Sequence, residues 1–494
     1  MVTNDMGFVF FRHMINVEVS KLAWEDQLNE DTKEALVHQL IPGPLARFRC
    51  CIYKEREIVR DRIRLACNQD IAGNQPGMTV QVIEPACQEC PLQSYSVTDN
   101  CRLCMGKPCQ SSCRFNAINI GAGRMFIDPN KCKECGQCAQ NCPFGAIVHL
   151  VRPCKSACPV GAISYDDYGL CVIDENKCIE CGQCIHSCSF AAIASRSSLV
   201  DIIGHIKAGH EVYAMCAPAT EGQFGEGIGM PSLRKALKEV GFTDMVEVGL
   251  GGDMTAAYES AEWSEAYHDG RKMTTSCCPA FINMLKKHFP KQYQENLSST
   301  VSPMCAVSRY LKSQHKDCIT VFVGPCIAKK SEAKDRSVPD NADYAVTYGE
   351  ITALLDSRNI QLAPVDDTYQ ESSVFGKGFA SSGGVSQAVM ECMKERGEDV
   401  DAIRVCKAAG GAECKKALSL LKAGRLPEDF IEGMACVGGC VGGPSKHQTE
   451  SEIRRARENL LKKADSRKIL ENLASYPMDS FSMHRDGSPS GLPV

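Results

Sequence analysis

The stretch Cys132–Pro143, CKECGQCAQNCP, decides the architecture of the N-terminal half of the chain. Its cysteines follow the spacing CxxCxxCxxxCP, in which three close cysteines hold one 4Fe–4S cube and the fourth ligates a neighbouring cube. Residues 178–189, CIECGQCIHSCS, repeat this spacing with Ser189 in place of the proline. A zinc site needs only four ligands, whereas these runs interlock. The spacing therefore indicates iron–sulfur clusters rather than zinc.

Each run has a cysteine-containing partner upstream. In the first case CxxCxxxxCxxxC precedes FNAI, and in the second only CKSAC precedes PVGAI, so the leading cysteine pair is missing there. The region reads as two tandem ferredoxin units. Exchanging the fourth ligands between the halves predicts three complete cubes. Their ligands are Cys101, Cys104, Cys109 and Cys142; Cys132, Cys135, Cys138 and Cys113; and Cys178, Cys181, Cys184 and Cys158.

Two cysteines, Cys154 and Cys188, have no partners in this scheme. The unused CxxC pair nearby is Cys87 and Cys90, which would complete a fourth cube. The alternative is a degenerate second unit and three cubes in total, and the spacing leaves both possibilities open. Cys171 is left over and is interpreted as structural.

Composition narrows the class of protein. The chain has 31 cysteines in 494 residues, clustered at short gaps that suit metal binding better than disulfides, which indicates a reducing, oxygen-poor compartment. The net charge of −5, with both signs interspersed, argues against a nucleic-acid partner. No apolar run approaches the roughly 18 residues of a membrane span, and the N-terminal residues lack the pattern of a signal peptide. We therefore expect a cytoplasmic protein without a membrane partner.

The composition changes along the chain and predicts four regions. Residues 1–84 are expected to be mainly helical, from the amphipathic pattern of residues 53–66. Residues 85–193 form an α+β tandem ferredoxin-like domain whose folding energy must come from metal ligation. Residues 194–450 form an α/β domain, in which short apolar runs (211–215, 245–250, 318–323 and 403–406) alternate with helical segments. Residues 451–494 are expected to form a charged helix and a mobile tail.

Three cysteine motifs occur in the α/β region. They are TSCCPAF at residues 275–281, GPCIAKKSE at 324–332 and EGMACVGGCVGGP at 432–444. The second follows the apolar run 318–323 directly, and a cysteine just past a buried strand lies where open α/β sheets bind ligands. Each motif alone is weak, but the three in this order behind a ferredoxin region are specific.

With these motifs, residues from about 100 to 445 resemble the iron-only hydrogenase family, whose hallmarks are TSCCPxW, MPCxxKxxE and ExMxCxxGCxxGGGxP. The resemblance implies a catalytic domain of the iron hydrogenase large-subunit type that carries an H-cluster, a 4Fe–4S cube joined to a di-iron centre with CO, CN and dithiolate ligands. Lys329 would donate to a cyanide ligand and Glu332 would orient Lys329. The cube would be ligated by Cys278, Cys326, Cys436 and Cys440, with Cys440 as the bridge. Met434, Ala217, Pro218 and residues 379–384 would line the pocket.

The resemblance also implies a proton relay of a cysteine, a glutamate, a serine and a second glutamate. The segment GGDMTAAYESAE supplies Glu262 and Glu259, one helical turn apart and so on one face. Cys277 lies next to Cys278, and LSS supplies Ser298. The predicted order from the active site is Cys277, Glu262, Ser298, Glu259 and then solvent.

Several residues depart from the prototypical motifs. Phe281 replaces Trp, Gly324 replaces Met, and Met304 stands where the best-known members have Gln. The third motif ends in GGP. These changes resemble the branch often called group B.

The function implied is reversible H₂ oxidation and proton reduction, with three or four accessory 4Fe–4S clusters. The partners implied are ferredoxin or a similar electron carrier and the H-cluster maturation proteins. The alternatives are a non-catalytic iron–sulfur scaffold protein and a hydrogen sensor. Cys277, Lys329 and the relay residues argue against the scaffold. The relay, with no recognisable signalling segment, argues against the sensor.

Overall fold

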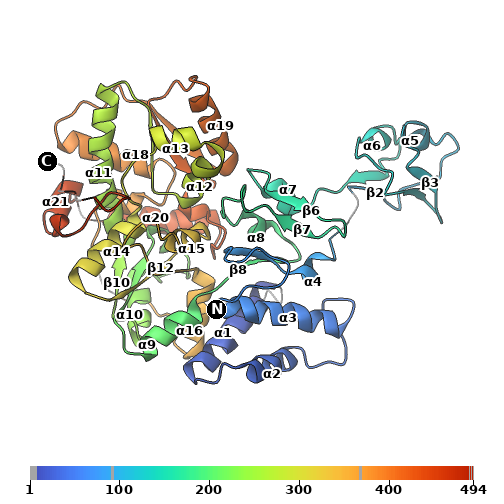
Figure 1. Cartoon of the computed structure of the whole chain (residues 1–494), viewed down its shortest axis with the longest axis horizontal. Coiled ribbons are helices and arrows are strands. Elements are labelled where there is room, and N and C mark those ends of the chain that lie inside the picture. The colour runs from blue at the N-terminus through green and yellow to red at the C-terminus, as the bar shows by residue number, and fades with distance from the viewer. Residues whose placement is uncertain are drawn as a thin grey trace.

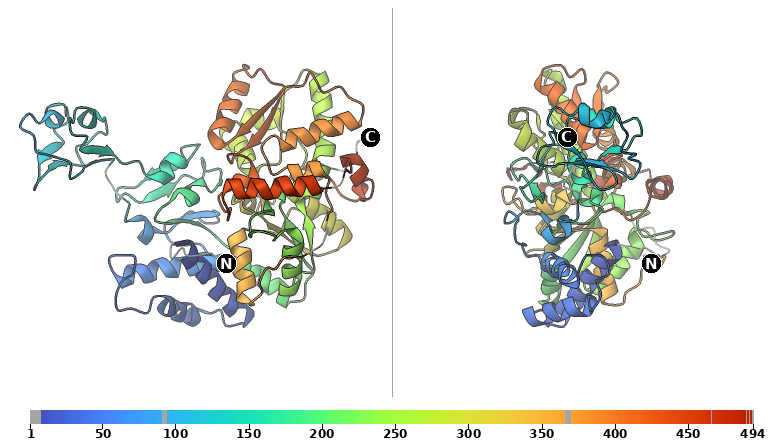
Figure 2. Two further views of the ribbon diagram at one scale, coloured as in Figure 1. Left: turned by 180° about the vertical axis from the view of Figure 1, so that it is seen from behind. Right: turned by 90° about the vertical axis from the view of Figure 1, so that its right-hand side faces the viewer.

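The computed structural model describes residues 8–90, 94–365, 370–464, 466–488, 490 and 492. A group of N-terminal helices and two small α+β units lie beside a large α/β domain (Figure 1). The first small unit protrudes furthest from that domain, in front and back views alike (Figures 1 and 2). Among the described helices, none has the length and apolar character needed to cross a membrane.

The N-terminal region is helical, as the amphipathic pattern predicted. It contains α1 (Phe8–Trp24), α2 (Glu30–Leu40) and α3 (Ile52–Ala66). A capping box starts α2, because the side chain of Asn29 accepts a hydrogen bond from the Thr32 amide and the Thr32 hydroxyl accepts from the Asn29 amide. All three helices bury side chains in one apolar cluster. Helix α1 also packs on α9 (Leu199–Lys207) and α16 (Tyr348–Ser357) of the α/β domain.

The two small units share one topology, which confirms the tandem ferredoxin-like prediction. Unit one, residues 94–150, contains β2 (Tyr95–Val97), α5 (Pro108–Ser111), β3 (Ile118–Ile120), β4 (Met125–Ile127), α6 (Gln137–Gln140) and β5 (Ile147–His149). Its strands pair antiparallel, β2 with β5 and β3 with β4. Unit two contains α7 (Pro153–Ala157), β6 (Ile163–Tyr165), β7 (Cys171–Ile173), α8 (Gln183–Ser187) and β8 (Ile193–Ser195).

The first strand of unit two comes from the segment before unit one. Strand β1 (Val80–Val82) pairs antiparallel with β8, as β2 pairs with β5 in unit one, and it leads into α4 (Glu84–Cys87). Unit two therefore comprises residues 80–90 and 151–195. The boundary predicted at residue 84 falls inside this unit, because the strand pairing joins segments more than a hundred residues apart in sequence.

The large domain is α/β, as predicted, with two parallel sheets. One sheet has the order β10 (Asp244–Glu247), β9 (Val212–Cys216), β12 (Ile319–Val323) and β13 (Tyr344–Val346). The other has the order β11 (Met273–Thr274), β15 (Phe430–Met434) and β14 (Val405–Ala409). Every pair is parallel, so the carboxyl ends of neighbouring strands share an edge. The flanking helices include α10 (Met230–Val240), α12 (Pro279–His288), α18 (Gly384–Glu395) and α19 (Gly411–Lys422).

The apolar run 245–250 was predicted as a single strand, and only its first part is one. Helix α11 (Val248–His268) begins inside the run. Its glycines allow close packing: a Cβ on Gly251 would collide with the Pro303 carbonyl of α14 (Pro303–Gln314), and one on Gly252 would lie 3.0 Å from the Phe379 ring. The glycine-rich sequence thus serves helix packing at the centre of the domain.

The described C-terminal residues belong to the α/β domain, so the prediction of a mobile tail was wrong for them. Helix α20 (Glu450–Lys463) lies across the face of the domain in the rear view (Figure 2, left), and α21 (Ile469–Leu473) packs against α11 and α18. The buried apolar side chains of this segment join the main core of the domain; they are Ile469, Leu473, Met478 and Met483. Their burial anchors the segment.

Candidate metal centres and active site

Unit one contains two thiol-lined pockets. One is lined by Cys101, Cys104, Cys109 and Cys142, and the other by Cys113, Cys132, Cys135 and Cys138. These are the two ligand sets predicted from exchanged fourth ligands. Within the described residues, no group of three or more His, Cys, Asp or Glu side chains is arranged around a single metal ion.

Four cysteines in the two units share a local backbone motif. In each, the amide of the alanine four residues later donates to the sulfur, at 3.2–3.4 Å; the pairs are Ala117–Cys113, Ala146–Cys142, Ala162–Cys158 and Ala192–Cys188. The residue before each alanine has a positive φ, namely Asn116, Gly145, Gly161 and Ala191. Amide hydrogen bonds to sulfur are one of the means by which proteins tune an iron–sulfur cluster. Both halves of both units are thus built alike.

The fourth predicted ligand set also comes together. The Cys171 amide donates to the Cys87 sulfur at 3.4 Å, just as the Met125 amide donates to the Cys101 sulfur at 3.4 Å. Cys87 therefore occupies in unit two the position of Cys101 in unit one. Burial raises the pKa of Cys87 and Cys90, and the neighbouring thiols Cys154 and Cys188 raise it further. Cys171, which the sequence analysis interpreted as structural, donates this hydrogen bond to Cys87 from its backbone amide.

The third set adjoins the α/β domain. Burial raises the pKa of Cys181 to about 11, and the nearby thiols Cys158 and Cys278 contribute. Burial and the thiols of Cys181, Cys178 and Cys158 also raise the pKa of Cys184. The loop of unit two fits closely here, because a Cβ on Gly182 would lie 2.7 Å from the Ile327 side chain. Cys178, Cys181, Cys184 and Cys158 thus form one group beside Cys278.

Three loops of the α/β domain bring four cysteines to one place. Cys278 follows β11 and precedes α12, Cys326 follows β12, and Cys436 and Cys440 follow β15. All lie past the carboxyl ends of parallel strands, where such sheets bind ligands. Burial raises the pKa of Cys326 and Cys436, and the other thiols of the group raise it further. The four predicted cube ligands therefore converge.

Cys440 is influenced by charges of both signs. Burial raises its pKa to about 11 and Cys278 contributes, whereas Lys329 and Arg457 lower it. Met434 and Ala217 are buried close by in the main core, and Pro218 begins the short helix η1 (Pro218–Thr220). These residues fit the site that the resemblance implies.

Lys329 is a buried, paired cation next to these thiols. Its Nζ donates to Glu332 at 2.6 Å and to the Ser302 hydroxyl at 2.9 Å. Burial alone would lower its pKa, but Glu332, Cys326 and Cys277 outweigh that effect and raise the pKa. Lys329 therefore remains an ammonium, and one of its three N–H donors is left for a ligand. Glu332 orients Lys329, as predicted.

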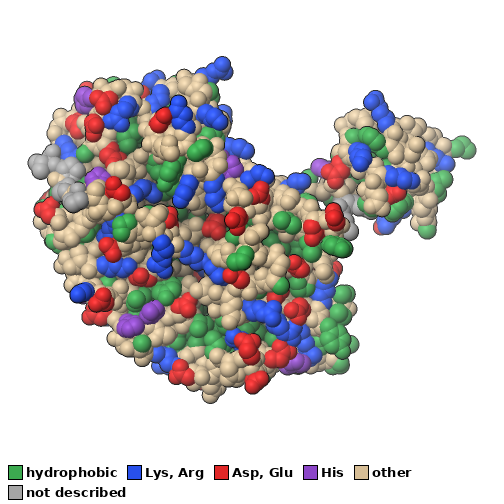
Figure 3. Space-filling view, viewed as in Figure 1, with side chains coloured by type: hydrophobic (Ala, Val, Ile, Leu, Met, Phe, Trp, Pro, Cys, Tyr) green, Lys and Arg blue, Asp and Glu red, His purple; other side chains and the backbone are tan. Residues whose placement is uncertain are grey.

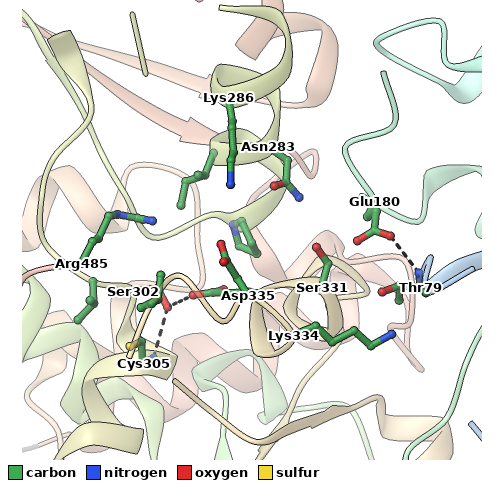
Figure 4. Close-up of a pocket in the computed structure, with 16 residues that line it drawn as sticks. Thr79, Glu180, Asn283, Lys286, Ser302, Cys305, Ser331, Lys334, Asp335 and Arg485 are labelled. Carbon is green, nitrogen blue, oxygen red and sulfur yellow. Dashed lines mark hydrogen bonds between the residues drawn. The ribbon is translucent and has the colours of Figure 1, made fainter. Parts of the chain in front are cut away.

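A cleft between unit two and the α/β domain reaches the partners of Lys329. Ser302 and Glu332 are among the residues that line it, as are Lys334 and Asp335. Lys286 points into the same space from α12 (Figure 4). The partners of Lys329 thus form part of the wall of this cleft.

The structure reverses the predicted order of the relay glutamates. Glu259 is the inner one: it is buried, its Oε1 accepts hydrogen bonds of 2.9 Å from the amide and hydroxyl of Ser276, and its charge acts on Cys277. Glu262 lies further out and accepts hydrogen bonds from Ser299. Because α11 runs from the core towards the surface, the earlier residue is the deeper one. Ser298 is hydrogen-bonded to Glu259, and its neighbour Ser299 to Glu262.

Glu259 is suited to proton transfer. Burial raises its pKa to about 7, the charge of Glu262 adds to this, and hydrogen bonding from Ser276 and Ser298 opposes it. Its Oε2 is buried and accepts no hydrogen bond from the described residues. A carboxyl group that titrates near neutral pH can both take and release a proton.

Sequence reasoning missed Arg457, which holds the loops of the site together. Its guanidinium donates to the carbonyls of Pro218 at 2.7 Å and Lys377 at 2.8 Å, and its charge lowers the pKa of Cys440. Arg457 and Ile453 are buried on one face of α20. The four-residue spacing was a signal of this face, although nothing in the sequence showed what it covers.

The fold and the thiol sites together define an iron–sulfur protein with two ferredoxin-like units and a further cysteine site in an α/β domain. Residues 210–444 match the family model "Iron only hydrogenase large subunit, C-terminal domain", and residues 125–148 match a 4Fe-4S binding domain. Residues 210–444 thus match the C-terminal domain of the iron-only hydrogenase large subunit, and a 4Fe-4S binding domain precedes them.

The relatives include enzymes and an assembly factor. The chain is 27% identical to iron hydrogenase 1 of Clostridium pasteurianum over 54% of its own length and 57% of the relative. It is 27% identical to the periplasmic [Fe] hydrogenase large subunit of Nitratidesulfovibrio vulgaris, over 64% of this chain and 85% of that one. It is 26% identical to the cytosolic Fe-S cluster assembly factor narfl of Xenopus tropicalis, over 36% and 48%. The first match thus spans little more than half of that enzyme.

Proposed function

We propose that this protein is a hydrogenase that reversibly oxidises H₂ to protons and electrons. The observation that carries the proposal is the buried Glu259, which lies near Cys277 beside the four-cysteine site, is hydrogen-bonded to Ser298 and has Glu262 on its outer side. A scaffold that only holds clusters moves no protons and needs no buried carboxyl group that titrates near pH 7. The departures at Phe281, Gly324 and Met304 support a place in the group B branch.

Each residue of the site has a task. Cys278, Cys326, Cys436 and Cys440 would hold the H-cluster, which when bound supplies the iron centre at which H₂ is split or formed. The Lys329 ammonium would donate to a cluster ligand while Glu332 holds it in place. Cys277 takes or gives the proton at the cluster end, and Glu259 exchanges it with Cys277. Met434 and Ala217 help to exclude water from the pocket.

Electrons would pass through the 4Fe–4S clusters of the two units to ferredoxin or a similar carrier. The repeated geometry at Cys87 and Cys101 supports four accessory clusters rather than three, with Cys87, Cys90, Cys154 and Cys188 as the fourth ligand set. We further propose a cytoplasmic location and maturation proteins that insert the di-iron centre. The similarity to narfl favours one other candidate, a non-catalytic cluster assembly protein.

The test is H₂ production by the anaerobically matured protein with a reduced viologen dye, for the wild type and Glu259→Gln. Loss of the buried acid–base group should lower turnover by at least about a hundredfold. Iron content should stay the same. Glu265→Gln is the control, because Glu265 lies further along α11 and is exposed.

The pH dependence gives a second readout. The pKa of Glu259 is raised to about 7, so below pH 7 the group holds a proton to donate and above pH 7 it can accept one. The wild-type rate should therefore change near pH 7, and that change should be absent in Glu259→Gln. An inactive wild type that carries its full complement of iron would support the assembly role instead.

A further inference from the structure

A chain of hydrogen bonds leads from Glu262 through Ser299 to a half-buried histidine. The Ser299 hydroxyl contacts the Glu262 carboxylate and lies 2.8 Å from Nδ1 of His484. Ser299 is exposed and His484 half-buried, so this pair lies where the path reaches solvent. In the described part of the chain, His484 is the one titratable side chain besides Glu262 that is hydrogen-bonded to Ser299.

Backbone contacts fix the position of His484. Its segment pairs with residues 299–301 through an isolated antiparallel bridge between Thr300 and His484. On either side, the Val301 amide donates to the Met483 carbonyl and the Arg485 amide to the Ser299 carbonyl, both at 2.9 Å. The Met483 side chain is buried in the main core. The histidine is thus held in place by the same segment that was predicted to be mobile.

Several charged residues lie close to the segment that carries His484. Arg309 donates to the His484 carbonyl at 2.7 Å, and Arg485 donates to the Ser276 carbonyl at 3.0 Å. The pKa of Asp486 is lowered chiefly by hydrogen bonds from the amide and hydroxyl of Ser488, and the charge of His484 lowers it further. Glu262 faces the ring through Ser299. An imidazole in this setting can exchange protons between a carboxyl group and water.

We propose that His484 is the terminal group of the proton path and exchanges protons with solvent on behalf of Glu262. In the outward direction, protonated Glu262 gives its proton to the Ser299 oxygen while the Ser299 hydroxyl proton moves to Nδ1 of neutral His484. The imidazolium then releases the Nε2 proton to water. One proton leaves, no electrons move, and the inward direction is the reverse. This inference rests on the proposed function.

The first test measures turnover of the holoenzyme with reduced viologen for His484→Gln and His484→Ala. If proton exit uses His484, both variants should be slower by about tenfold or more. Millimolar imidazole should restore much of the rate in His484→Ala, and a rise in the solvent deuterium isotope effect should accompany the loss. His268→Ala is the matched control, since His268 is an exposed histidine on α11, the helix of Glu262, whose ring bonds only to the Ser264 carbonyl among the described residues.

The second test does not depend on activity. In protein labelled with ¹⁵N-histidine, the Nδ1 resonance of His484, assigned by its absence in His484→Gln, should move in Ser299→Ala and stay in place in Ser264→Ala. A wild type without H₂ turnover would count against the proposed function. An active wild type with an unchanged rate in both His484 variants, or an Nδ1 signal unaffected by Ser299→Ala, would overturn the role of His484.

Discussion

The two ferredoxin-like units have the same strand pairing. They also have the same half-sites, each formed by a cysteine sulfur and the alanine amide that donates to it. They differ in where their cysteines come from and in which parts of the molecule they adjoin. Unit one supplies eight cysteines from its own residues, 94–150. Unit two takes Cys87 and Cys90 from the segment before unit one, and its Cys181 lies next to Cys278 of the α/β domain. The same repeated thiol motif thus occurs in two different surroundings, one far from the α/β domain and one beside it.

The surfaces of the units differ accordingly. Unit one protrudes and exposes large hydrophobic side chains, which include Met105, Ile120, Phe126 and Phe144; hydrophobic surface is visible on this lobe in Figure 3. Unit two lies between unit one and the α/β domain, next to the N-terminal helices (Figure 1). Under the proposed function, unit one would receive electrons from a carrier and unit two would deliver them to the active site.

The largest expected effect comes from replacing one predicted cluster ligand in each unit and comparing the two variants. Cys181→Ser should reduce H₂ production to background with any electron donor, because the cluster next to Cys278 is disturbed. Cys135→Ser, in unit one, should abolish only the ferredoxin-driven reaction and keep turnover with a small dye that reaches unit two directly. The measurement is H₂ evolution with both donors. Full dye-driven turnover in Cys181→Ser would break the comparison.

The next effect concerns the borrowed ligand pair. Replacement of both Cys87 and Cys90 by Ser should remove about four irons per chain, the content of one cube. The control is Cys50→Ser with Cys51→Ser, an exposed pair in the same N-terminal region. Iron analysis and the paramagnetic resonance of the reduced protein would measure the loss. An unchanged iron content would mean that unit two carries one cluster and that the total is three.

The smallest expected effect is on the free energy of unfolding, and it comes from the residue with positive φ in each half-site. Ala191 adopts φ 47° where unit one has Gly145 and Asn116. A side chain in this region costs about 1–2 kcal/mol, so Ala191→Gly should raise the free energy of unfolding by about 1 kcal/mol, the net of relieved strain and added chain entropy. The reverse change, Gly145→Ala, should lower it by a similar amount, since a Cβ there meets no other atom.

Denaturant unfolding of the holoprotein, followed by cluster absorbance, would measure both changes. If Ala191→Gly left stability unchanged while Gly145→Ala lowered it, the two half-sites would not be equivalent in backbone strain. A loss of stability in Ala191→Gly would contradict the account of the repeat.

The thiol sites could be predicted from sequence because ligand spacing is local. CxxC and CxxxC runs specify which cysteines share a cube, and the pockets of unit one contain the predicted sets. The order of Glu259 and Glu262 could not be predicted in the same way, because it depends on the direction in which α11 leaves the core. The position of Cys87 was suggested by elimination, but its equivalence to Cys101 required the pairing of β1 with β8.

The C-terminal segment shows a different limit. Its buried residues, such as Leu473 and Met483, belong to a short stretch interrupted by Pro477 and several serines, so no long periodic apolar pattern marks them. What buries them is the surface of α11 and its neighbours, which exists only after the domain has folded. The position of the residues around His484 could therefore not be predicted from the sequence.

Infrared spectroscopy of the anaerobically matured protein tests the central claim most directly, because the proposed di-iron centre carries CO and CN ligands next to Cys440. We predict sharp CO and CN stretching bands in the wild type, retained in Cys277→Ala, which lacks the first relay thiol, and lost in Cys440→Ser. A protein loaded with iron that shows no such bands would contradict the claim that these four cysteines hold a hydrogen-converting centre.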